Sequence, residues 1–348
     1  MCMKFSELIL NWYDENKRNL PWRLTKDPYK IWISEIILQQ TRIAQGTSYY
    51  NRFISRFPTL ESLAKSEEND VLLMWQGLGY YSRARNLHFT AQFIHNKLGG
   101  IFPNTFESLL ELKGVGDYTA SAIASICFGI PQAVVDGNVY RFLSRYFGIE
   151  TPINSTSAHK IFKKKAMSLI GDSHPGTFNQ AMMEFGSLHC TPKKPKCSTC
   201  PFSKNCVAFN QNKISCLPVK TSRTKIKKRY FNYMVVSDHQ DYYIFEKRLN
   251  KGIWQNLYQF PLLESTKVLK SEKKLVAHPN FPKKFNTISK TIKLLNSSPV
   301  IHKLSHQILE VNFWQIKTKM KLNNSVSKES IYKFPVPVVI DDFLKKFF

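Results

Sequence analysis

Four cysteines fall within seventeen residues, and they constrain the local fold more than any other feature of the chain. Cys190, Cys197, Cys200 and Cys206 follow the spacing C-x6-C-x2-C-x5-C in CTPKKPKCSTCPFSKNC. The N-terminus, MCMKFSELILNWYDENKR, is no signal peptide, so we expect an intracellular protein whose grouped thiols bind metal. A zinc ribbon usually has two C-x2-C pairs, and one is present here. The spacing therefore favours an iron–sulfur cluster, with zinc as the alternative.

Positive charge is concentrated in the second part of the chain. Of the net charge of +25, residues 1–150 carry +2 and residues 151–348 carry +23. Residues 185–237 contain 11 basic side chains and no acidic one. Such a field favours a polyanion, most often nucleic acid, with a lysine-rich bias as the plainer alternative. No apolar run reaches the roughly 20 residues of a membrane span, so we expect no membrane partner.

The character of the sequence changes near residue 232. Before it, residues 5–210 have helical periodicity, and Gly and Pro separate the segments. After it, YMVVSD, DYYIFEKRL and ILEVNFWQIKT are β-branched and aromatic and predict strands. One helix is expected to begin at Asp27-Pro28 and to carry residues 31–40 on neighbouring turns. Further helices are expected near 60–75, 82–97, 105–112, 117–128, 138–147, 156–170 and 175–188.

Glu35 stands alone in the apolar run IWISEIIL at residues 31–38. It is either an exposed residue of an amphipathic helix or a proton donor kept away from water. A general acid that works near neutral pH needs a raised pKa, and burial of a carboxyl group among apolar side chains raises its pKa. Ile31, Trp32 and Ile36 would supply that environment.

The segment LLELKGVGDYTASAIAS at residues 109–125 predicts a helix, a tight turn and a second helix. Glycines bring backbone N–H groups close to an anion, and the second helix directs its N-terminus to the same place. Lys113, Gly114 and Gly116 are therefore expected at a DNA phosphate, although a plain turn is the alternative. Further on, VVDGNVYR contains Asp136, which by itself would most simply be a turn residue or a helix N-cap.

These segments together resemble the base-excision DNA glycosylases with a helix-hairpin-helix and a Gly/Pro-Asp signature, and are most similar to the MutY-type adenine DNA glycosylases. The resemblance covers roughly residues 5–210. It rests on RNLPWR, DPYKIWISEIILQQT, WQGLGYYSRARNL, LKGVGDYTASAIAS, VVDGNVYR, NQAMMEFGSLHC and the cysteine spacing. It implies a mainly α fold followed by a smaller α+β Nudix-like domain. The expected parts are an iron–sulfur cluster domain (1–23 and 137–210), a six-helix barrel (24–136), a basic linker (211–230) and the Nudix-like domain (231–348).

The resemblance also implies a mechanism. Glu35 would protonate the adenine ring, and Asp136, kept ionised, would stabilise or transiently trap the oxocarbenium-like sugar. Tyr118 and Asn138 would position this pair and the water. A lyase of the related endonuclease III branch has a Schiff-base lysine where Tyr118 stands, so we expect a monofunctional enzyme that leaves an abasic site. A DNA-binding protein without activity is the non-enzymatic alternative, and retention of both carboxylates argues against it.

Further residues receive roles from the same resemblance, because a base inside a duplex must be flipped out before it can react. Core packing is the alternative for Trp22 and Tyr80. The four cysteines would hold one [4Fe-4S] cluster. The expected adenine pocket is Arg18, Leu20, Trp22, Arg23 and Glu184; the wedge is Gln40 and Tyr80; Thr41 and Leu78 lie beside the orphaned base; Arg83 joins the hairpin at the DNA backbone. Lys194 is expected at the backbone as well, because it is one of the lysines of the cysteine loop.

Residues 231–348 resemble the family's Nudix-like domain through DYYIFEKRLNKGIWQNLYQFPLL. The glutamate-rich magnesium box is missing, so this domain should bind and not hydrolyse. The family recognises 8-oxoguanine through a Phe-Ser-His loop; here Ser305 and His306 match and Leu304 replaces the aromatic residue. The domain looks short, with little room for its usual helix. The expected partner is double-stranded DNA with A:8-oxoguanine or A:G, bound by a cytoplasmic monomer of bacterial type, associated with the nucleoid through DNA.

Overall fold

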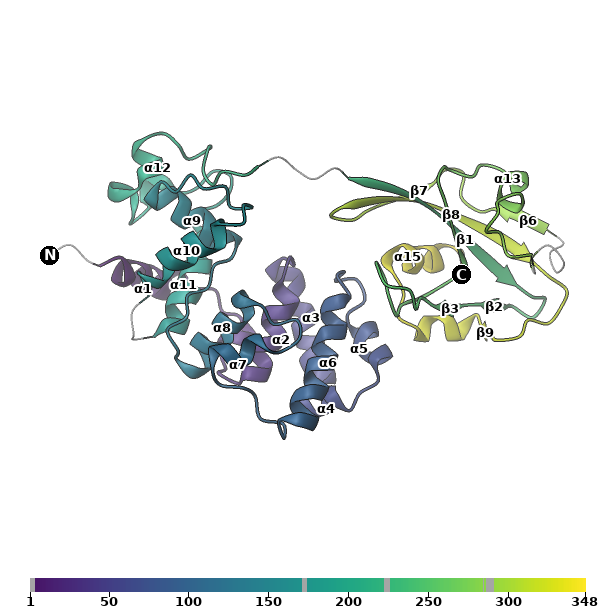
Figure 1. The fold of residues 1–348 in the computed structure, drawn as a ribbon, viewed down its shortest axis with the longest axis horizontal. Coiled ribbons are helices and arrows are strands. Elements are labelled where there is room, and N and C mark those ends of the chain that lie inside the picture. The colour runs from purple at the N-terminus through teal and green to yellow at the C-terminus, as the bar shows by residue number, and fades with distance from the viewer. Residues whose placement is uncertain (1–3, 171–173, 222–225, 284, 286–290) are drawn as a thin grey trace. The chain divides into compact units, whose positions relative to one another are not determined.

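The computed structural model describes residues 4–170, 174–221, 226–283, 285 and 291–348 (Figure 1). These residues form two compact units. The first unit contains the described residues up to Ser66 and those from Asn86 to Thr221. The second unit contains Glu67–Arg85 and the described residues from Ile226 onward. No helix in these described ranges is long and apolar enough to cross a membrane.

The first unit is helical, as expected. One expected helix, over 60–75, is wrong: it is two helices, because Glu67 has an extended backbone (ψ 143°) and caps the second of them. That second helix, α5, and the start of α6 belong to the second unit. The helices are α1 (Phe5–Asn16), α2 (Pro28–Leu38), α3 (Ile43–Arg56), α4 (Leu60–Ala64), α5 (Glu68–Met74), α6 (Ser82–Lys97), α7 (Phe106–Leu110), α8 (Asp117–Phe128), α9 (Gly137–Phe147), α10 (Ala158–Met167), α11 (Pro175–Leu188) and α12 (Val207–Asn210), with 3-10 turns η1 (Pro21–Arg23), η2 (Cys197–Thr199) and η3 (Ser203–Asn205).

Helix α2 is buried on all sides. The Asp27 side chain accepts a hydrogen bond from the Tyr29 N–H at 2.9 Å, and Pro28 occupies the first helical position, as the sequence predicts. Every residue from Ile31 to Ile37 is buried, including Glu35. The helix ends at Leu38, so the expectation that it continues to Gln40 is wrong. Gln40 has φ 57°, and this left-handed conformation cannot continue a right-handed helix.

Helix α11 packs on α1, α8 and α9. Its glycines permit close approach. A Cβ atom at Gly186 would lie 2.7 Å from the Cβ of Asn138, and one at Gly176 would lie 2.7 Å from the Cα of Ile126. A core of Trp12, Phe142, Phe185 and their neighbours fills the space between α1, α9 and α11. The side chains of α11 are thereby brought to the start of α9 and the end of α8.

The second unit is built on a seven-stranded sheet with the order β6-β8-β1-β2-β9, in which β5 also pairs with β1 and β7 with β8. The two long strands β1 (Lys227–Ser237) and β8 (Gln307–Lys317) pair in parallel along their full length, and both were expected. Since β1 begins at Lys227, the end of the expected linker is strand. The shorter strands are β2 (Tyr242–Ile244), β3 (Glu246–Lys247), β4 (Tyr258–Gln259), β5 (Leu262–Ser265), β6 (Thr291–Leu294), β7 (Val300–Lys303) and β9 (Ser325–Ser327).

Helices cover both faces of this sheet, so the expectation of little room for a helix is wrong. Leu275 of α13 (Glu272–Val276) packs with Met234 and Trp314 on one face. On the other face, Phe343 of α15 (Val338–Phe347) stacks on Phe313 with ring centres 3.9 Å apart. A short 3-10 helix, η4 (Glu329–Lys333), precedes α15.

Candidate active site

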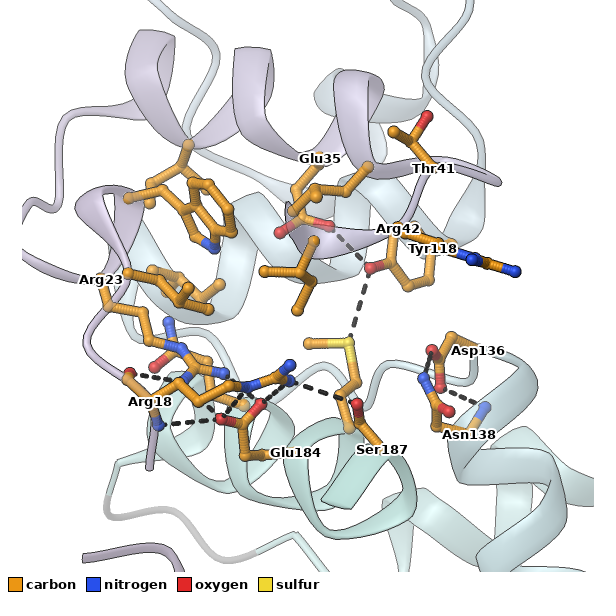
Figure 2. A pocket seen from close by; sticks show the side chains of 18 residues that line it. Arg18, Arg23, Glu35, Thr41, Arg42, Tyr118, Asp136, Asn138, Glu184 and Ser187 are labelled. Atoms are coloured by element: carbon orange, nitrogen blue, oxygen red, sulfur yellow. Dashed lines mark hydrogen bonds and ion pairs between the residues drawn. The ribbon is translucent and has the colours of Figure 1, made fainter. Parts of the chain in front are cut away.

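One cavity in the first unit collects the expected catalytic residues and the expected adenine pocket (Figure 2). Its volume is about 400 Å³, which is in the range of small-molecule sites. Its walls come from α2, α8, α9, α11 and the segment around η1. Gln40 does not line it; this side chain is exposed. The expected residues that do line it are Arg18, Leu20, Trp22, Arg23, Glu35, Thr41, Tyr118, Asp136, Asn138 and Glu184.

Glu35 is a buried carboxyl group held by one hydrogen bond. Only 6% of the residue is exposed, and the Tyr118 hydroxyl donates to its Oε2 at 2.7 Å. Burial raises the pKa of Glu35 to about 7; the Tyr118 hydrogen bond lowers it and the nearby Asp136 raises it. Glu35 is therefore buried as expected and the amphipathic-surface alternative is wrong, while its role as a proton donor stays a prediction.

Asp136 caps helix α9 and faces the same cavity. Its Oδ1 accepts from the backbone N–H groups of Asn138 and Val139 at 2.9 and 2.8 Å, and its Oδ2 accepts from the Asn138 side chain at 2.7 Å. Burial raises the pKa of Asp136, and these three hydrogen bonds oppose that rise because they favour the ionised form. Asn138 is fixed in turn, since its Oδ1 accepts from Arg141 at 2.9 Å.

Glu184 forms the charged end of the cavity with two arginines. Arg18 donates through Nε and Nη2 at 2.8 and 2.6 Å, and Arg23 donates through Nη1 and Nη2 at 3.0 and 2.9 Å. Burial alone would raise the pKa of Glu184, but these hydrogen bonds outweigh it and lower that pKa to about 2. Beside this group, Leu20 and Trp22 are buried and give the cavity an apolar wall. An aromatic base could lie against this wall.

The hairpin between α7 and α8 has the geometry of an anion site. Gly114 has φ 83°, and a Cβ atom there would lie 2.8 Å from the Cβ of Asn86, so the turn requires glycine. Gly116 caps α8 without a side-chain hydrogen bond, which leaves the first N–H groups of that helix available. The Lys113 ammonium lies 4.2 Å from the centre of the Phe89 ring. The contact of this hairpin with DNA stays a prediction.

Some of the residues expected at the wedge, the orphaned base and the lesion meet in a different cavity, which lies within the second unit, whereas Thr41, expected beside Leu78, lines the first cavity. Leu78, Tyr80, Ser305 and His306 line it together with Trp254, and its volume is about 380 Å³. The hydroxyl groups of Tyr80 and Ser305 form a hydrogen bond. Tyr80 is 45% exposed and has φ 47°, a conformation uncommon for a bulky side chain. The core-packing alternative for Tyr80 therefore does not hold.

Arg83, expected at the DNA backbone, contacts its own segment. Its Nη2 donates to the Gly79 carbonyl at 3.2 Å, and its guanidinium lies 5.4 Å from the centre of the Trp75 ring. Lys194, the other expected backbone contact outside the hairpin, is exposed in the cysteine loop with φ 50°. Their roles toward DNA stay predictions.

The four cysteines line one small cavity beside Phe142, Arg145 and Phe202. Arg145 fixes the loop by donating to the Thr191 and Pro192 carbonyls at 2.7 and 3.2 Å, and its Nη1 lies 3.6 Å from the Cys190 sulfur. In the described ranges, no three His, Cys, Asp or Glu side chains are grouped to hold a metal ion. Four thiols around one space, with aromatic cover and a nearby guanidinium, nevertheless fit a thiolate-bound cluster.

Several residues that line the first cavity were not expected. The Met183 sulfur accepts from the Tyr118 hydroxyl at 3.5 Å, and the Ser187 hydroxyl accepts from Arg18 at 3.2 Å. Arg42 stands at the end of the cavity occupied by Asp136 (Figure 2). Ser187 lies three residues after Glu184 and four after Met183 on α11, so helical spacing offered a signal. Arg42 gave none, because exposed arginines are common.

Two family descriptions match the chain: HhH-GPD superfamily base excision DNA repair protein over residues 33–168, and NUDIX domain over residues 232–346. The adenine DNA glycosylase of Buchnera aphidicola subsp. Baizongia pistaciae is 36% identical over 339 residues, which cover 97% of this chain and 93% of that protein. The adenine DNA glycosylase of Homo sapiens is 44% identical over 213 residues, covering 59% of this chain and 39% of that protein.

Solved structures match the helical part. A thermostable thymine-DNA glycosylase is similar with a TM-score of 0.56 and 33% identity, over 60% of this chain and 95% of that chain. A non-covalent endonuclease III–DNA complex gives a TM-score of 0.52 over 60% of this chain and 94% of that chain. Its identity is 21%, so it bears on the fold alone. The first family match ends at residue 168, within the helical part, and the second begins at residue 232, within strand β1.

Proposed function

The chain belongs to the adenine DNA glycosylase family, and on this premise we propose that it hydrolyses the N-glycosidic bond of adenine mispaired with 8-oxoguanine or guanine, leaving an abasic site. That it is a DNA N-glycosylase of base-excision repair follows from the family itself. The expected family, enzyme class and mainly helical fold with a Nudix-like domain are thereby confirmed. The mispair, the product and the roles of single residues belong to the proposal.

The observation that carries the proposal is the pairing of two unlike carboxyl groups in one cavity. Glu35 accepts one hydrogen bond, from Tyr118, and burial raises its pKa to about 7. Asp136 accepts three hydrogen bonds and caps a helix, and both features favour its anion. One proton donor and one anion are what the loss of a purine requires, because a protonated base leaves and a cationic sugar remains.

The proposed reaction begins with the flipped adenine against Trp22 and Leu20, near the Glu184 end of the cavity. Glu35 gives its proton to the adenine ring, and the C1′–N9 bond breaks with its electron pair leaving on the base. Asp136 stabilises the resulting sugar cation until water adds to C1′ and passes a proton to the Glu35 carboxylate, which restores the acid. Asn138 holds Asp136 through a hydrogen bond, and Tyr118 holds Glu35 in the same way. The two residues together would also position the water.

The product should be an abasic site and not a cleaved strand. A lyase would need an amine beside C1′ to form a Schiff base. No lysine is found among the described residues that line the cavity. The Tyr118 hydroxyl, where a lyase would have its lysine, donates a hydrogen bond to Glu35. Lys113, the nearest in sequence, lies against Phe89.

Recognition of the partner base is assigned to the second cavity. Tyr80 with Ser305 forms a hydroxyl pair there, and His306 and Leu78 complete it. Hydroxyl groups can read the extra polar atoms of 8-oxoguanine by donating or accepting hydrogen bonds.

The loop of Cys190, Cys197, Cys200 and Cys206 would hold one [4Fe-4S] cluster, which would order this loop beside α9.

The test is a single-turnover assay on duplexes that contain A:8-oxoguanine, A:G or A:T, with half of each sample heated in alkali. We expect strand breaks with the first two duplexes, only after alkali. A second sample receives borohydride, which traps Schiff bases. Strand breaks without alkali, together with a borohydride adduct that needs one lysine, would show a lyase. Equal rates on all three duplexes would refute the assigned mispair.

A further inference from the structure

Three guanidinium groups line the catalytic cavity, and their circumstances differ. Arg18 and Arg23 are both committed to Glu184. Arg42 is exposed, and within the ranges that the structure describes its side chain has no hydrogen-bond or ion-pair partner. Among the described residues that line the cavity, Arg42 is thus the cation that no protein group pairs with. From its position we propose, building on the function above, that Arg42 binds a backbone phosphate next to the flipped nucleotide.

The backbone at Arg42 is well fixed. This residue caps α3, and its carbonyl accepts from the Gly46 N–H at 2.8 Å. Gly46 packs so closely on α2 that a Cβ atom there would lie 2.7 Å from the Leu38 side chain. The start of α3 is therefore held against the end of the helix that carries Glu35. Arg42 has a defined position relative to the acid, although its guanidinium is in solvent.

The order of groups along the cavity places a phosphate at Arg42. Glu184 and its arginines lie at one end, Glu35 and Tyr118 in the middle, and Asp136 and Asn138 at the other end, where Arg42 also stands (Figure 2). A nucleotide that enters base-first puts its base at the first end and its sugar beside Asp136. The next group along the strand is a phosphate. A planar guanidinium suits this anion, since it can donate two parallel hydrogen bonds.

This contact would do more than add affinity. A phosphate held at Arg42 fixes the sugar next to it, and the sugar carries the C1′ atom that Asp136 faces. The cation also offsets the negative charge that a phosphate would otherwise bring toward the two carboxyl groups. Arg42 is thus assigned as a DNA-binding and positioning residue, and it takes no part in proton transfer.

The experiment compares Arg42→Gln, Arg42→Lys and a matched control, Arg52→Gln. Arg52 lies on the same helix, is exposed and stacks on Tyr49 at 4.4 Å outside the cavity, so its loss changes net charge equally. Binding is measured over a range of salt to a duplex with a 2′-fluorinated, uncleavable deoxyadenosine opposite guanine. One lost phosphate contact lowers the slope of log Kd against log salt by about 0.9. We expect the lower slope, together with binding about 5-fold weaker, for Arg42→Gln, and neither change for Arg42→Lys or Arg52→Gln.

A second arm locates the phosphate. Neutral methylphosphonates replace, one at a time, the phosphates on either side of the target nucleotide. For one of them, wild-type binding should weaken about 5-fold while Arg42→Gln shows no further loss, the signature of a direct pair in a double-mutant cycle. Equal losses in both proteins at every position, or Arg42→Gln behaving like Arg52→Gln, would overturn the assignment. The proposed function is checked separately, because it fails if wild-type enzyme releases no adenine from a cleavable A:G or A:8-oxoguanine duplex.

Discussion

Two glutamates line the same cavity and differ in almost everything except burial. Glu184 is 2% exposed and Glu35 is 6% exposed. Two arginines lower the pKa of Glu184 to about 2, whereas burial without a cation in contact raises that of Glu35 to about 7. The comparison teaches that burial does not decide protonation by itself; the partner of the carboxyl group does. One end of the cavity thus favours a charged carboxylate, and the middle favours a carboxyl group that keeps its proton.

The largest effect is expected from Glu35→Gln, which removes the proton and keeps the shape. Adenine release under single-turnover conditions should fall by about 10³-fold, within the range for loss of a general acid. Binding to the uncleavable duplex serves as the control and should survive, because the amide fills the same space. A rate within ten-fold of wild type would show that Glu35 is not the acid.

The stability of the protein should also report on Glu35. The carboxyl group ionises near pH 4.5 when unfolded and near pH 7 when folded, so the folded chain holds the extra proton between these values. Its contribution is therefore full below pH 4.5 and is lost as the pH rises to about 7, a change of about 3 kcal/mol. When the free energy of unfolding is measured in urea, the difference between Glu35→Gln and wild type should change by this amount in favour of the variant from pH 4.5 to pH 8. A difference that does not vary with pH would contradict the raised pKa.

Glu184→Gln tests the other end of the cavity. The amide leaves two guanidinium groups without their counter-charge, which destabilises the folded state by about 2 kcal/mol. This is less than for a fully buried pair, because the Arg18 side chain is 31% exposed. The matched control is Glu150→Gln, whose pair with Lys213 is exposed on both sides. Thermal midpoints should fall for the first variant only; equal changes would show that the Glu184 cluster is no stronger than a surface pair.

The smallest effect is expected from Tyr118→Phe. The lost hydroxyl donates to Glu35 and lowers its pKa, so its removal raises that pKa further. The alkaline decline in adenine release should then move to higher pH, with a modest change in the maximal rate. Tyr140→Phe is the control, because its ring packs on Phe162 away from the cavity lining. A shift to lower pH would mean that Tyr118 stabilises the protonated form of Glu35.

Local patterns predicted the residues that carry chemistry better than the geometry between them. The apolar run around Glu35 indicated a buried carboxyl group, but the Asp-Gly at Asp136 by itself predicted only a turn or a helix N-cap, and it was the family resemblance that paired Asp136 with Glu35. The left-handed turn at Gln40 was missed, since a glutamine gives no sign of positive φ. Helix α15 was also missed, although Val339, Ile340, Phe343 and Leu344 recur with helical spacing.

The sequence could not predict which charged side chains form ion pairs with one another. Arg18, Arg23 and Arg42 look alike in sequence, yet two are bonded to a glutamate about 160 residues away and the third is not. Such pairing depends on how α11 packs across the first unit, through close contacts at Gly176 and Gly186. These contacts are tertiary, and one sequence does not reveal them.

The saturation of Glu184 has a consequence for turnover. Its two oxygens accept five hydrogen bonds from Arg18 and Arg23, which fills the roughly four lone-pair positions of a carboxylate. A free base can bond there only by displacing an arginine, so binding is an exchange with little net gain. Once the glycosidic bond is broken, the detached base has no sugar to hold it in place. We expect weak product inhibition by free adenine, and a cavity that empties quickly between reactions.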